Sequence, residues 1–145
     1  MNLNDIIQEL KNKPNIKEIQ NILNNYDSID YKDLIEFSDN TYKRIPIYTT
    51  EDFDIILICW NKGQYTKIHD HPDYCCVVKL LEGLLLEENF SVYEDKLKVF
   101  NNIIIKPNDI TSKCSNKIVH RIVPLDKSVS LHIYIPGKYK ANYYE

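Results

Sequence analysis

The sequence lacks several features that mark common functional classes. No apolar run approaches the roughly 20 residues that a membrane-spanning helix needs, and the N-terminus lacks the basic-then-apolar plan of a secretory signal. The net charge is −3, and charges of both signs are mixed along the chain. Without a cationic excess, the sequence predicts neither nucleic acid nor an anionic membrane as a partner.

The cysteines also lack the spacing of a disulfide framework or a redox motif. There are four, and none is arranged as CxxC: Cys59, Cys75, Cys76 and Cys114. Two of them are adjacent, which makes a regular disulfide pattern less expected. The sequence therefore predicts reduced thiols and a cytoplasmic location.

The first forty residues have the periodicity of helices. Apolar residues recur at i, i+3, i+4 and i+7 within residues 3–10, which is the stripe of an amphipathic helix. Pro14 ends this helix, and Asn15 with Glu18 forms the capping box of a second one. Ser28 is expected to cap a third, short helix. These segments predict a helical layer that packs on the rest of the chain.

From residue 42 onward the pattern changes to short strands separated by turn residues. Strands are expected at residues 42–48, 53–60, 66–71, 75–81, 84–93, 96–106, 109–115, 118–123 and 128–135. Many closely spaced strands without intervening helices indicate an antiparallel sandwich or barrel. At 145 residues we expect a single domain, with a helical layer (1–40), a β-barrel (42–136) and a short C-terminal tail (137–145).

Histidines provide the first indication of chemistry. His69 and His71 are separated by one residue, and side chains at i and i+2 of an extended segment share a face, so both could bind one metal ion. Asp70 then points to the opposite face, where we expect a solvated carboxylate, as we do for Asp73. His120 on a separate strand could complete a facial site with open positions for a substrate.

Ligand type alone leaves the metal open between zinc and ferrous iron. A blue-copper site is not expected, because the only methionine is Met1 and the usual axial ligand is missing. Ser130, His132 and Tyr134 alternate on one face of a strand and could form a hydrogen-bond chain. They do not resemble a hydrolytic relay, since residues on one strand face cannot easily place a Ser–His–carboxylate system.

A family resemblance adds to this interpretation. The spacing Gly63-x5-His69-x-His71-x4-Cys76-x6-Gly83 is similar to the first cupin motif, with cysteine where most cupins have a glutamate ligand. That substitution and the His-Asp-His core most resemble cysteine dioxygenases, which are thiol dioxygenases with the cupin fold.

The second half of the chain resembles the same family. His120-Arg121 is similar to its third iron ligand and neighbour, Ser130-Leu-His-Ile-Tyr134 to its Ser-His-Tyr triad, and Tyr42-Lys-Arg44 to its substrate-binding segment. The resemblance covers roughly residues 30–136 and implies a mainly β, cupin-type antiparallel barrel, jelly-roll-like, with a short α-helical N-terminal layer. Pro124 departs from it, because Asn is common there.

The resemblance also implies an activity and assigns residues to it. It implies oxidation of L-cysteine by O2 to cysteine sulfinate, a step of cysteine catabolism. We expect the enzyme to be a monomer. Its implied site consists of an Fe(2+) held by His69, His71 and His120, a substrate contact from Arg44 and Tyr42, catalysis by Ser130, His132 and Tyr134, and a thioether bond between Cys76 and Tyr134.

Two alternatives stay open at this point. One is a dioxygenase for another small thiol, such as 3-mercaptopropionate or cysteamine. Arg44 argues against both, because relatives that act on 3-mercaptopropionate tend to carry Gln at this position and cysteamine has no carboxylate. The other is a metal-binding cupin without catalysis. The remaining residues near the motifs are expected to be structural: Cys59, Trp60, Cys75, Cys114 and Arg121.

Overall fold

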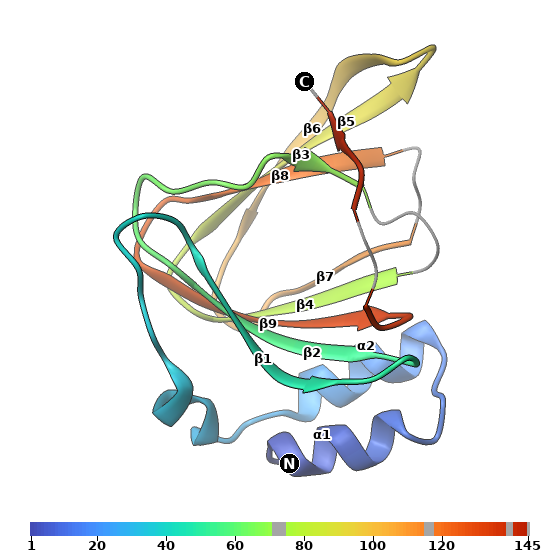
Figure 1. The fold of residues 1–145 in the computed structure, drawn as a ribbon, viewed down its shortest axis with the longest axis vertical. Coiled ribbons are helices and arrows are strands. Elements are labelled where there is room, and N and C mark those ends of the chain that lie inside the picture. The colour runs from blue at the N-terminus through green and yellow to red at the C-terminus, as the bar shows by residue number, and fades with distance from the viewer. Residues whose placement is uncertain (71–74, 115–117, 139–140, 145) are drawn as a thin grey trace.

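Two five-stranded antiparallel sheets face each other in the protein (Figure 1). The computed structural model describes residues 1–70, 75–114, 118–138 and 141–144. The first sheet has the order β1 (Lys43–Thr49), β2 (Asp54–Trp60), β9 (Ser128–Ile135), β4 (Cys75–Glu82) and β7 (Ile110–Lys113). The second has the order β10 (Tyr143–Tyr144), β3 (Ile68–His69), β8 (Ile118–Pro124), β5 (Leu85–Tyr93) and β6 (Lys96–Ile105).

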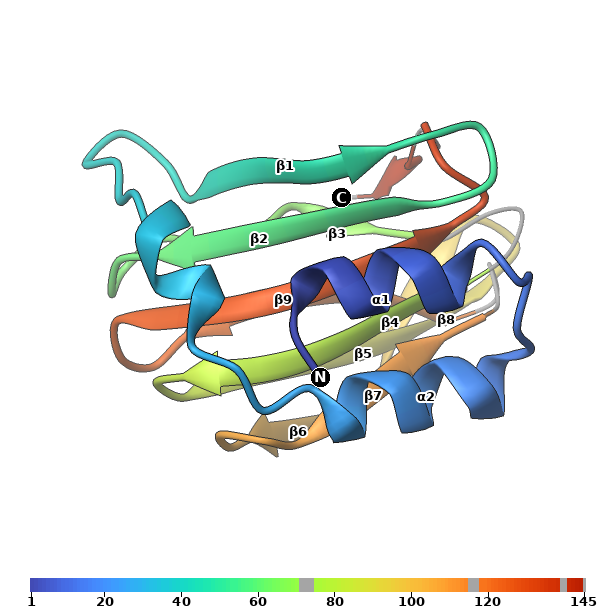
Figure 2. The ribbon, with the colours of Figure 1, turned by 90° about the horizontal axis from the view of Figure 1, so that it is seen from below.

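Two helices cover the outer face of the first sheet (Figure 2). They are α1 (Leu3–Leu10) and α2 (Ile16–Asn25), and the expected third helix is a short 3-10 turn, η1 (Asp30–Leu34). The capping box of Asn15 with Glu18 is confirmed, and Asn2 with Asp5 forms a second one at the start of α1. No helix in the described ranges is long and apolar enough to span a membrane.

The alternation along β2 divides the interior into two apolar clusters. Ile55, Leu57 and Cys59 pack toward the helices, together with the apolar faces of α1 and α2. Ile56, Ile58 and Trp60 belong to the second cluster, which faces the second sheet. Because both faces of this strand are buried, it is an almost continuous apolar run instead of an alternating one.

A buried lysine joins the helical layer to the first sheet. Lys79 on β4 is 4% exposed, and its Nζ donates to the carbonyl oxygens of Leu23 at 2.9 Å and Tyr26 at 2.7 Å. These carbonyls lie at the C-terminal end of α2, where helices leave acceptors unpaired. The lysine therefore caps the helix and fixes its position over the sheet.

The expected strands are present, with differences at two places. Of the strand expected at 66–71, β3 includes Ile68–His69, and residue 71 lies outside the described residues. Thr66 is held to Ile122 of β8 by its backbone N–H, which donates to the Ile122 carbonyl, and by its hydroxyl oxygen, which accepts from the Ile122 N–H. The tail expected after residue 136 contains β10, which pairs with β3. A two-residue strand of this kind has no periodicity to reveal it.

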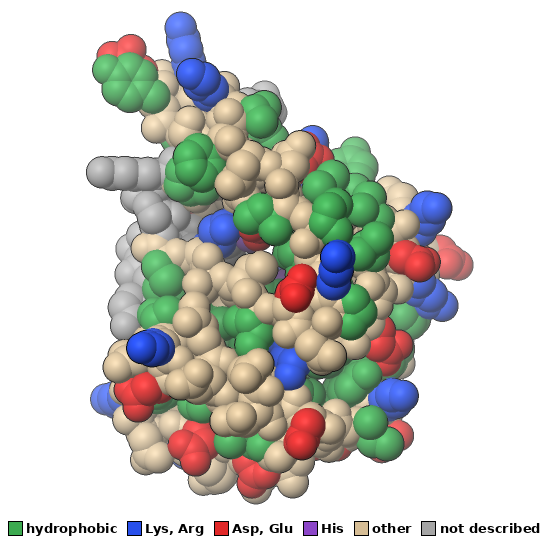
Figure 3. Space-filling view, turned by 180° about the vertical axis from the view of Figure 1, so that it is seen from behind, with side chains coloured by type: hydrophobic (Ala, Val, Ile, Leu, Met, Phe, Trp, Pro, Cys, Tyr) green, Lys and Arg blue, Asp and Glu red, His purple; other side chains and the backbone are tan. Residues whose placement is uncertain are grey.

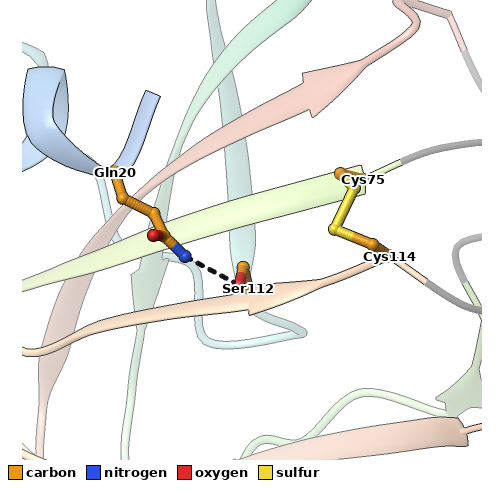
Figure 4. The surroundings of a disulfide bond; sticks show 4 residues. All are labelled: Gln20, Cys75, Ser112 and Cys114. Atoms are coloured by element: carbon orange, nitrogen blue, oxygen red, sulfur yellow. Dashed lines mark hydrogen bonds between the residues drawn. A yellow bond between two sulfur atoms is a disulfide. The ribbon is translucent and has the colours of Figure 1, made fainter. Parts of the chain in front are cut away.

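The prediction of reduced thiols is wrong for two of the four cysteines. A disulfide joins Cys75 at the start of β4 to Cys114 just after β7 (Figure 4). In the β4–β7 ladder Cys76 is opposite Lys113, so the next residues outward, Cys75 and Cys114, also face each other. Their separation of 39 residues gave no sign of this pairing. Cys59 and Cys76 are free thiols.

Gly83, in the turn between β4 and β5, is expected to be sensitive to substitution. Its φ is +96°, and an added Cβ would overlap Ser128 Oγ and the carbonyl oxygen of Lys127. Gly83→Ala combines backbone strain of about 1–2 kcal/mol with an overpacking cost of about 1–3 kcal/mol. Urea denaturation should show a free energy of unfolding lower by the sum, roughly 2–5 kcal/mol.

Gly63 is the matched control for this substitution. Its φ of +93° is almost the same, but an added Cβ would meet nothing within 4 Å. Gly63→Ala should therefore cost only the backbone strain, about 1–2 kcal/mol. Equal losses at the two positions would contradict the steric part of the argument.

Candidate active site

A cavity of about 310 Å³ lies between the inner faces of the two sheets. Seven of the nine residues expected from the sequence line it: Tyr42, Arg44, His69, Cys76, His120, His132 and Tyr134. Ser130 is fully buried behind this lining, and His71 lies outside the described residues. The strand alternation therefore brings residues far apart in the chain to one cavity.

His69 and His120 meet at the wall formed by the second sheet. They are directly opposite each other in the antiparallel pair of β3 and β8. Their Nε2 atoms are 3.0 Å apart, and the two rings lie edge to face. Within the described part of the chain, no group of three or more His, Cys, Asp or Glu side chains is arranged to hold a metal ion.

The other ring nitrogens determine what the two Nε2 atoms present to each other. His69 Nδ1 is 2.7 Å from the carbonyl oxygen of Lys67, and His120 Nδ1 is 3.0 Å from Glu87 Oε2. A carbonyl and a carboxylate only accept, so both Nδ1 atoms carry the proton. When both rings are neutral, each has one N–H, so both Nε2 atoms direct lone pairs at the same point.

This arrangement fits a metal cation. Two lone pairs facing each other repel unless a cation, either a proton or a metal ion, lies between them. For metal–nitrogen bonds of about 2.0–2.1 Å, two ligands at a right angle lie about 2.9 Å apart, close to the 3.0 Å observed. Burial, followed by the proximity of His120, lowers the pKa of His69 to about 4, so the imidazole is neutral and able to bind metal at pH 7.

The predicted row of Ser130, His132 and Tyr134 is buried and hydrogen-bonded. Ser130 Oγ lies 2.7 Å from His132 Nε2, and Tyr134 Oη lies 3.3 Å from His132 Nδ1. Trp60 Nε1 donates to Ser130 Oγ at 2.9 Å. Trp60 was expected to be only a core residue; it is buried, but it also extends this row by one member.

The direction of the protons along the row follows from Ser130. Its oxygen accepts from Trp60, and among the described residues His132 Nε2 is the acceptor within reach of its hydroxyl proton. His132 Nε2 therefore accepts, and the ring proton lies on Nδ1, facing the Tyr134 oxygen. Burial, and then the charge of Arg44, lower the pKa of His132 well below its usual value, so the ring is neutral.

Cys76 and Tyr134 are cross-strand neighbours. They are directly opposite in the antiparallel pair of β4 and β9, where side chains on one face lie about 4.5–5.5 Å apart at Cβ. Burial raises the pKa of the Cys76 thiol to about 12, so the sulfur is protonated at neutral pH. The guanidinium of Arg44 lies 5.3 Å from the centre of the Tyr134 ring.

Two residues complete the cavity on the side of β1. Arg44 is exposed on this strand and lines the cavity. Tyr42 stacks on Trp60 with ring centres 4.8 Å apart, and burial raises the pKa of its phenol. The cavity lining thus includes a guanidinium and several phenols, among them those of Tyr42 and Tyr134, together with the paired histidines.

The expectation that Asp70 is a solvated carboxylate is wrong. It is 1% exposed and accepts from the backbone and side-chain nitrogens of Asn142 at 2.8 and 3.0 Å and from Tyr144 Oη at 3.0 Å. These bonds hold β10 against β3, next to His69. Tyr143 of the same strand lines the cavity. Asp73 lies outside the described residues.

Glu87 is a buried residue of the site that the sequence motifs did not reveal. Its burial opposes ionisation, but the hydrogen bond from His120 and the charge of Lys113 outweigh this and hold the carboxyl pKa well below its usual value. One signal was available in the sequence. Glu87 and Asn89 are polar residues on the same face of β5 as the apolar Leu85, and this is the buried face.

The surface outside the cavity carries mixed charges. On the face opposite that of Figure 1, acidic and basic side chains are interspersed (Figure 3). Arg121, which follows His120, pairs with Glu88 at 2.8 Å, and neither residue lines the cavity.

Solved structures with similar folds include proteins described as cupins or as double-stranded beta-helix proteins. A protein with a double-stranded beta-helix domain from Klebsiella pneumoniae matches with a TM-score of 0.63 and 17% identity, covering 83% of this chain and 97% of that one. An RmlC-like cupin from Desulfovibrio desulfuricans matches with a TM-score of 0.56 and 18% identity, covering 76% and 96%. The expected cupin-type barrel is confirmed.

Sequence comparisons identify the family. The chain is 30% identical over 132 residues to cysteine dioxygenase type 1 of Danio rerio, and 26% identical over 131 residues to that of Homo sapiens. Each match covers 84% of this chain and 66% of the relative, so the chain spans about two thirds of the relatives' length. The family of cysteine dioxygenase type I, a family of thiol-oxidising metalloenzymes, matches residues 1–145. The chain therefore belongs to the cysteine dioxygenase type I family.

Proposed function

We propose that this protein is an iron(II)-dependent dioxygenase that converts the thiol of L-cysteine to a sulfinate. The observation that carries the proposal is the pair of Nε2 atoms of His69 and His120, 3.0 Å apart, in the lining of a cavity that Arg44 also lines. Family membership supports the reaction class. In the net reaction both atoms of one O2 molecule are added to the cysteine sulfur.

The metal would be held by His69 and His120, with His71 as the third ligand. When bound, ferrous iron would supply deprotonation of the substrate thiol and the chemistry of dioxygen. Three neutral ligands would leave its positive charge uncompensated, which favours an anionic substrate. Cys76 contributes to this, because its thiol is protonated and adds no negative charge.

Arg44 would bind the carboxylate of L-cysteine. A guanidinium presents a planar fork of donors that matches a carboxylate, a geometry that lysine lacks. Its place in the cavity lining, against the Tyr134 ring, supports this assignment. Tyr42 lines the same region and would add a hydroxyl contact.

Tyr134 would stabilise charge on the reacting groups. His132 Nδ1–H faces the Tyr134 oxygen, so the phenol proton is directed elsewhere, and both the sulfur of Cys76 and the cavity lie on that side. A buried, oriented donor of this kind stabilises negative charge that develops during reaction. Ser130 and Trp60 hold His132 in the required tautomer.

Oxygen consumption with a panel of thiols tests the proposal. Iron-loaded protein is expected to consume O2 fastest with L-cysteine, and mass spectrometry should detect cysteine sulfinate with two added oxygen atoms. A higher rate with 3-mercaptopropionate or cysteamine would assign a different thiol. Metal binding without oxygen uptake on any thiol would indicate a binding protein.

We also expect Cys76 and Tyr134 to become joined by a thioether during turnover. Their direct opposition in the β4–β9 ladder supports contact between the sulfur and the ring. The bond forms by a two-electron oxidation, with O2 as the oxidant, that removes one hydrogen from sulfur and one from the ring. Peptide mapping after aerobic incubation with iron and cysteine should show the two peptides joined and lighter by one hydrogen pair.

The cross-link should increase the rate without being essential. It would hold the phenol in one orientation and reduce the ordering needed in the transition state. Cys76→Ser is therefore expected to retain iron and a reduced turnover. Separate peptides after extended turnover, together with full activity of Cys76→Ser, would show that Cys76 only fills space.

A further inference from the structure

Glu87 occupies a position that normally holds an apolar side chain. Along β5 the buried residues alternate with partly exposed ones, and Leu85, Glu87 and Asn89 share the buried face. Glu87 is 1% exposed. A carboxylate at such a position is costly unless its hydrogen bonds and charge are satisfied, so its partners indicate why it is there.

Both carboxylate oxygens are used by donors from three strands. Oε2 accepts from His120 Nδ1 of β8 at 3.0 Å. Oε1 accepts from Lys113 Nζ of β7 at 3.0 Å and from Asn89 Nδ2 of β5 at 3.1 Å. One carboxylate oxygen therefore bonds to the histidine, and the other bonds to the two groups that hold the carboxylate in place.

The bond to His120 fixes two properties of that ring. It keeps the proton on Nδ1 and leaves the lone pair on Nε2, and it sets the plane of the ring so that Nε2 faces His69. In the β5–β8 ladder Glu87 is opposite Ile122, so His120 is its diagonal neighbour and within reach. Carboxylates that orient metal-binding histidines in this way also increase the basicity of the ligand.

Lys113 prevents this carboxylate from adding net charge to the cavity. It reaches Glu87 from the first sheet, whereas Glu87 and His120 lie in the second. Its side chain is 18% exposed and that of Glu87 1%, so the pair is largely shielded from solvent screening. The pair is neutral as a unit, which leaves the environment of His120 suited to an anionic substrate.

We propose that Glu87 is a positioning residue that orients His120 for metal binding, with Lys113 as its charge partner across the two sheets. The inference rests on the proposed function in one respect, that His120 binds the metal. It assigns Glu87, Lys113 and His120 to one hydrogen-bonded unit and predicts that metal affinity depends on a residue that does not touch the metal.

The test measures binding of Co(II), and of Fe(II) under anaerobic conditions, to the purified metal-free protein. Glu87→Gln leaves one acceptor oxygen for the three donors and turns an amide N–H2 toward the others. Its affinity for either metal is expected to fall by about 10- to 100-fold, the usual cost of losing an outer partner of a metal ligand. The visible bands of bound Co(II) should shift, because the ring orientation and basicity change.

The next residue provides a matched control. Glu88 on the same strand pairs with Arg121 at 2.8 Å and does not line the cavity, so Glu88→Gln should bind Co(II) with wild-type affinity and spectrum. In Glu87→Gln the buried ammonium of Lys113 loses its charge partner, and the variant could fail to fold for that reason. The double variant Glu87→Gln with Lys113→Gln removes both charges and should show the same loss of metal affinity.

Two outcomes separate this inference from the function on which it depends. Wild-type affinity and an unchanged Co(II) spectrum in Glu87→Gln, or in the double variant, would overturn the role of Glu87 alone. The proposed metal site itself would be overturned if the wild-type protein bound neither Co(II) nor Fe(II). It would also be overturned if the His120→Ala variant bound these metals as tightly as the wild type does.

Discussion

Replacing His120 by alanine is expected to remove both tight iron binding and cysteine oxidation. The substitution deletes one of the two described Nε2 lone pairs that converge at 3.0 Å. Losing an outer partner costs about 10- to 100-fold in metal affinity, so losing a ligand should cost more than about 100-fold. Iron content after gel filtration, and competition with a chromogenic chelator, measure this loss, and oxygen uptake should fall to background.

A second histidine in the same cavity is the control. His132 also lines the cavity, but its two ring nitrogens are engaged by Ser130 and Tyr134. His132→Asn should therefore retain iron while losing turnover, because the tyrosine is no longer oriented. If His120→Ala kept stoichiometric iron and normal activity, or if both variants lost iron equally, the ligand assignment would be wrong.

Arg44→Gln is expected to reduce kcat/KM for L-cysteine by about 10- to 150-fold. Hydrogen bonds to charged groups contribute roughly 1.5–3 kcal/mol, and each 1.36 kcal/mol corresponds to about tenfold in rate. Cysteamine lacks the carboxylate, so its low rate should change little. Initial rates of oxygen uptake with both thiols measure the difference, and the iron content should be unchanged.

Lys43→Gln provides the comparison for this variant. Lys43 precedes Arg44 on β1, points to the other face and pairs with Glu36 at 3.7 Å. The Lys43→Gln substitution therefore removes one positive charge, as Arg44→Gln does, but at a position outside the cavity. Its activity should match that of the wild type. Equal losses on L-cysteine and cysteamine in Arg44→Gln would show that Arg44 supports the fold and does not bind the substrate carboxylate.

The motif residues were visible in the sequence because their chemistry is rare and their spacing is local. His69 and His120 are two of only four histidines, and Ser130, His132 and Tyr134 lie at every second position of one strand. Alternation alone placed that row on a single face. Whether this face was buried or solvated depended on the packing of the second sheet, which the strand pattern could not give.

The residues that support the site were not visible in the same way. Glu87 and Asp70 are acidic residues among many: Asp70 was expected to be a solvated carboxylate, and the sequence motifs gave Glu87 no role. Their partners are distant in the chain: Asp70 accepts from Asn142 and Tyr144, and Glu87 from Lys113 and His120. A buried carboxylate is identified only by donors that the fold brings to it.

The sequence by itself determined the class of this protein: a short helical layer before a chain of alternating strands, and a set of histidines with cupin spacing. Periodicity and motif spacing are local properties, so they survive without a structure. Only the tertiary structure decided the pairing of Cys75 with Cys114, the strand β10 and the Glu87–Lys113 unit. Each depends on the register between strands far apart in the chain, where a shift of one residue would turn the side chains to the other face.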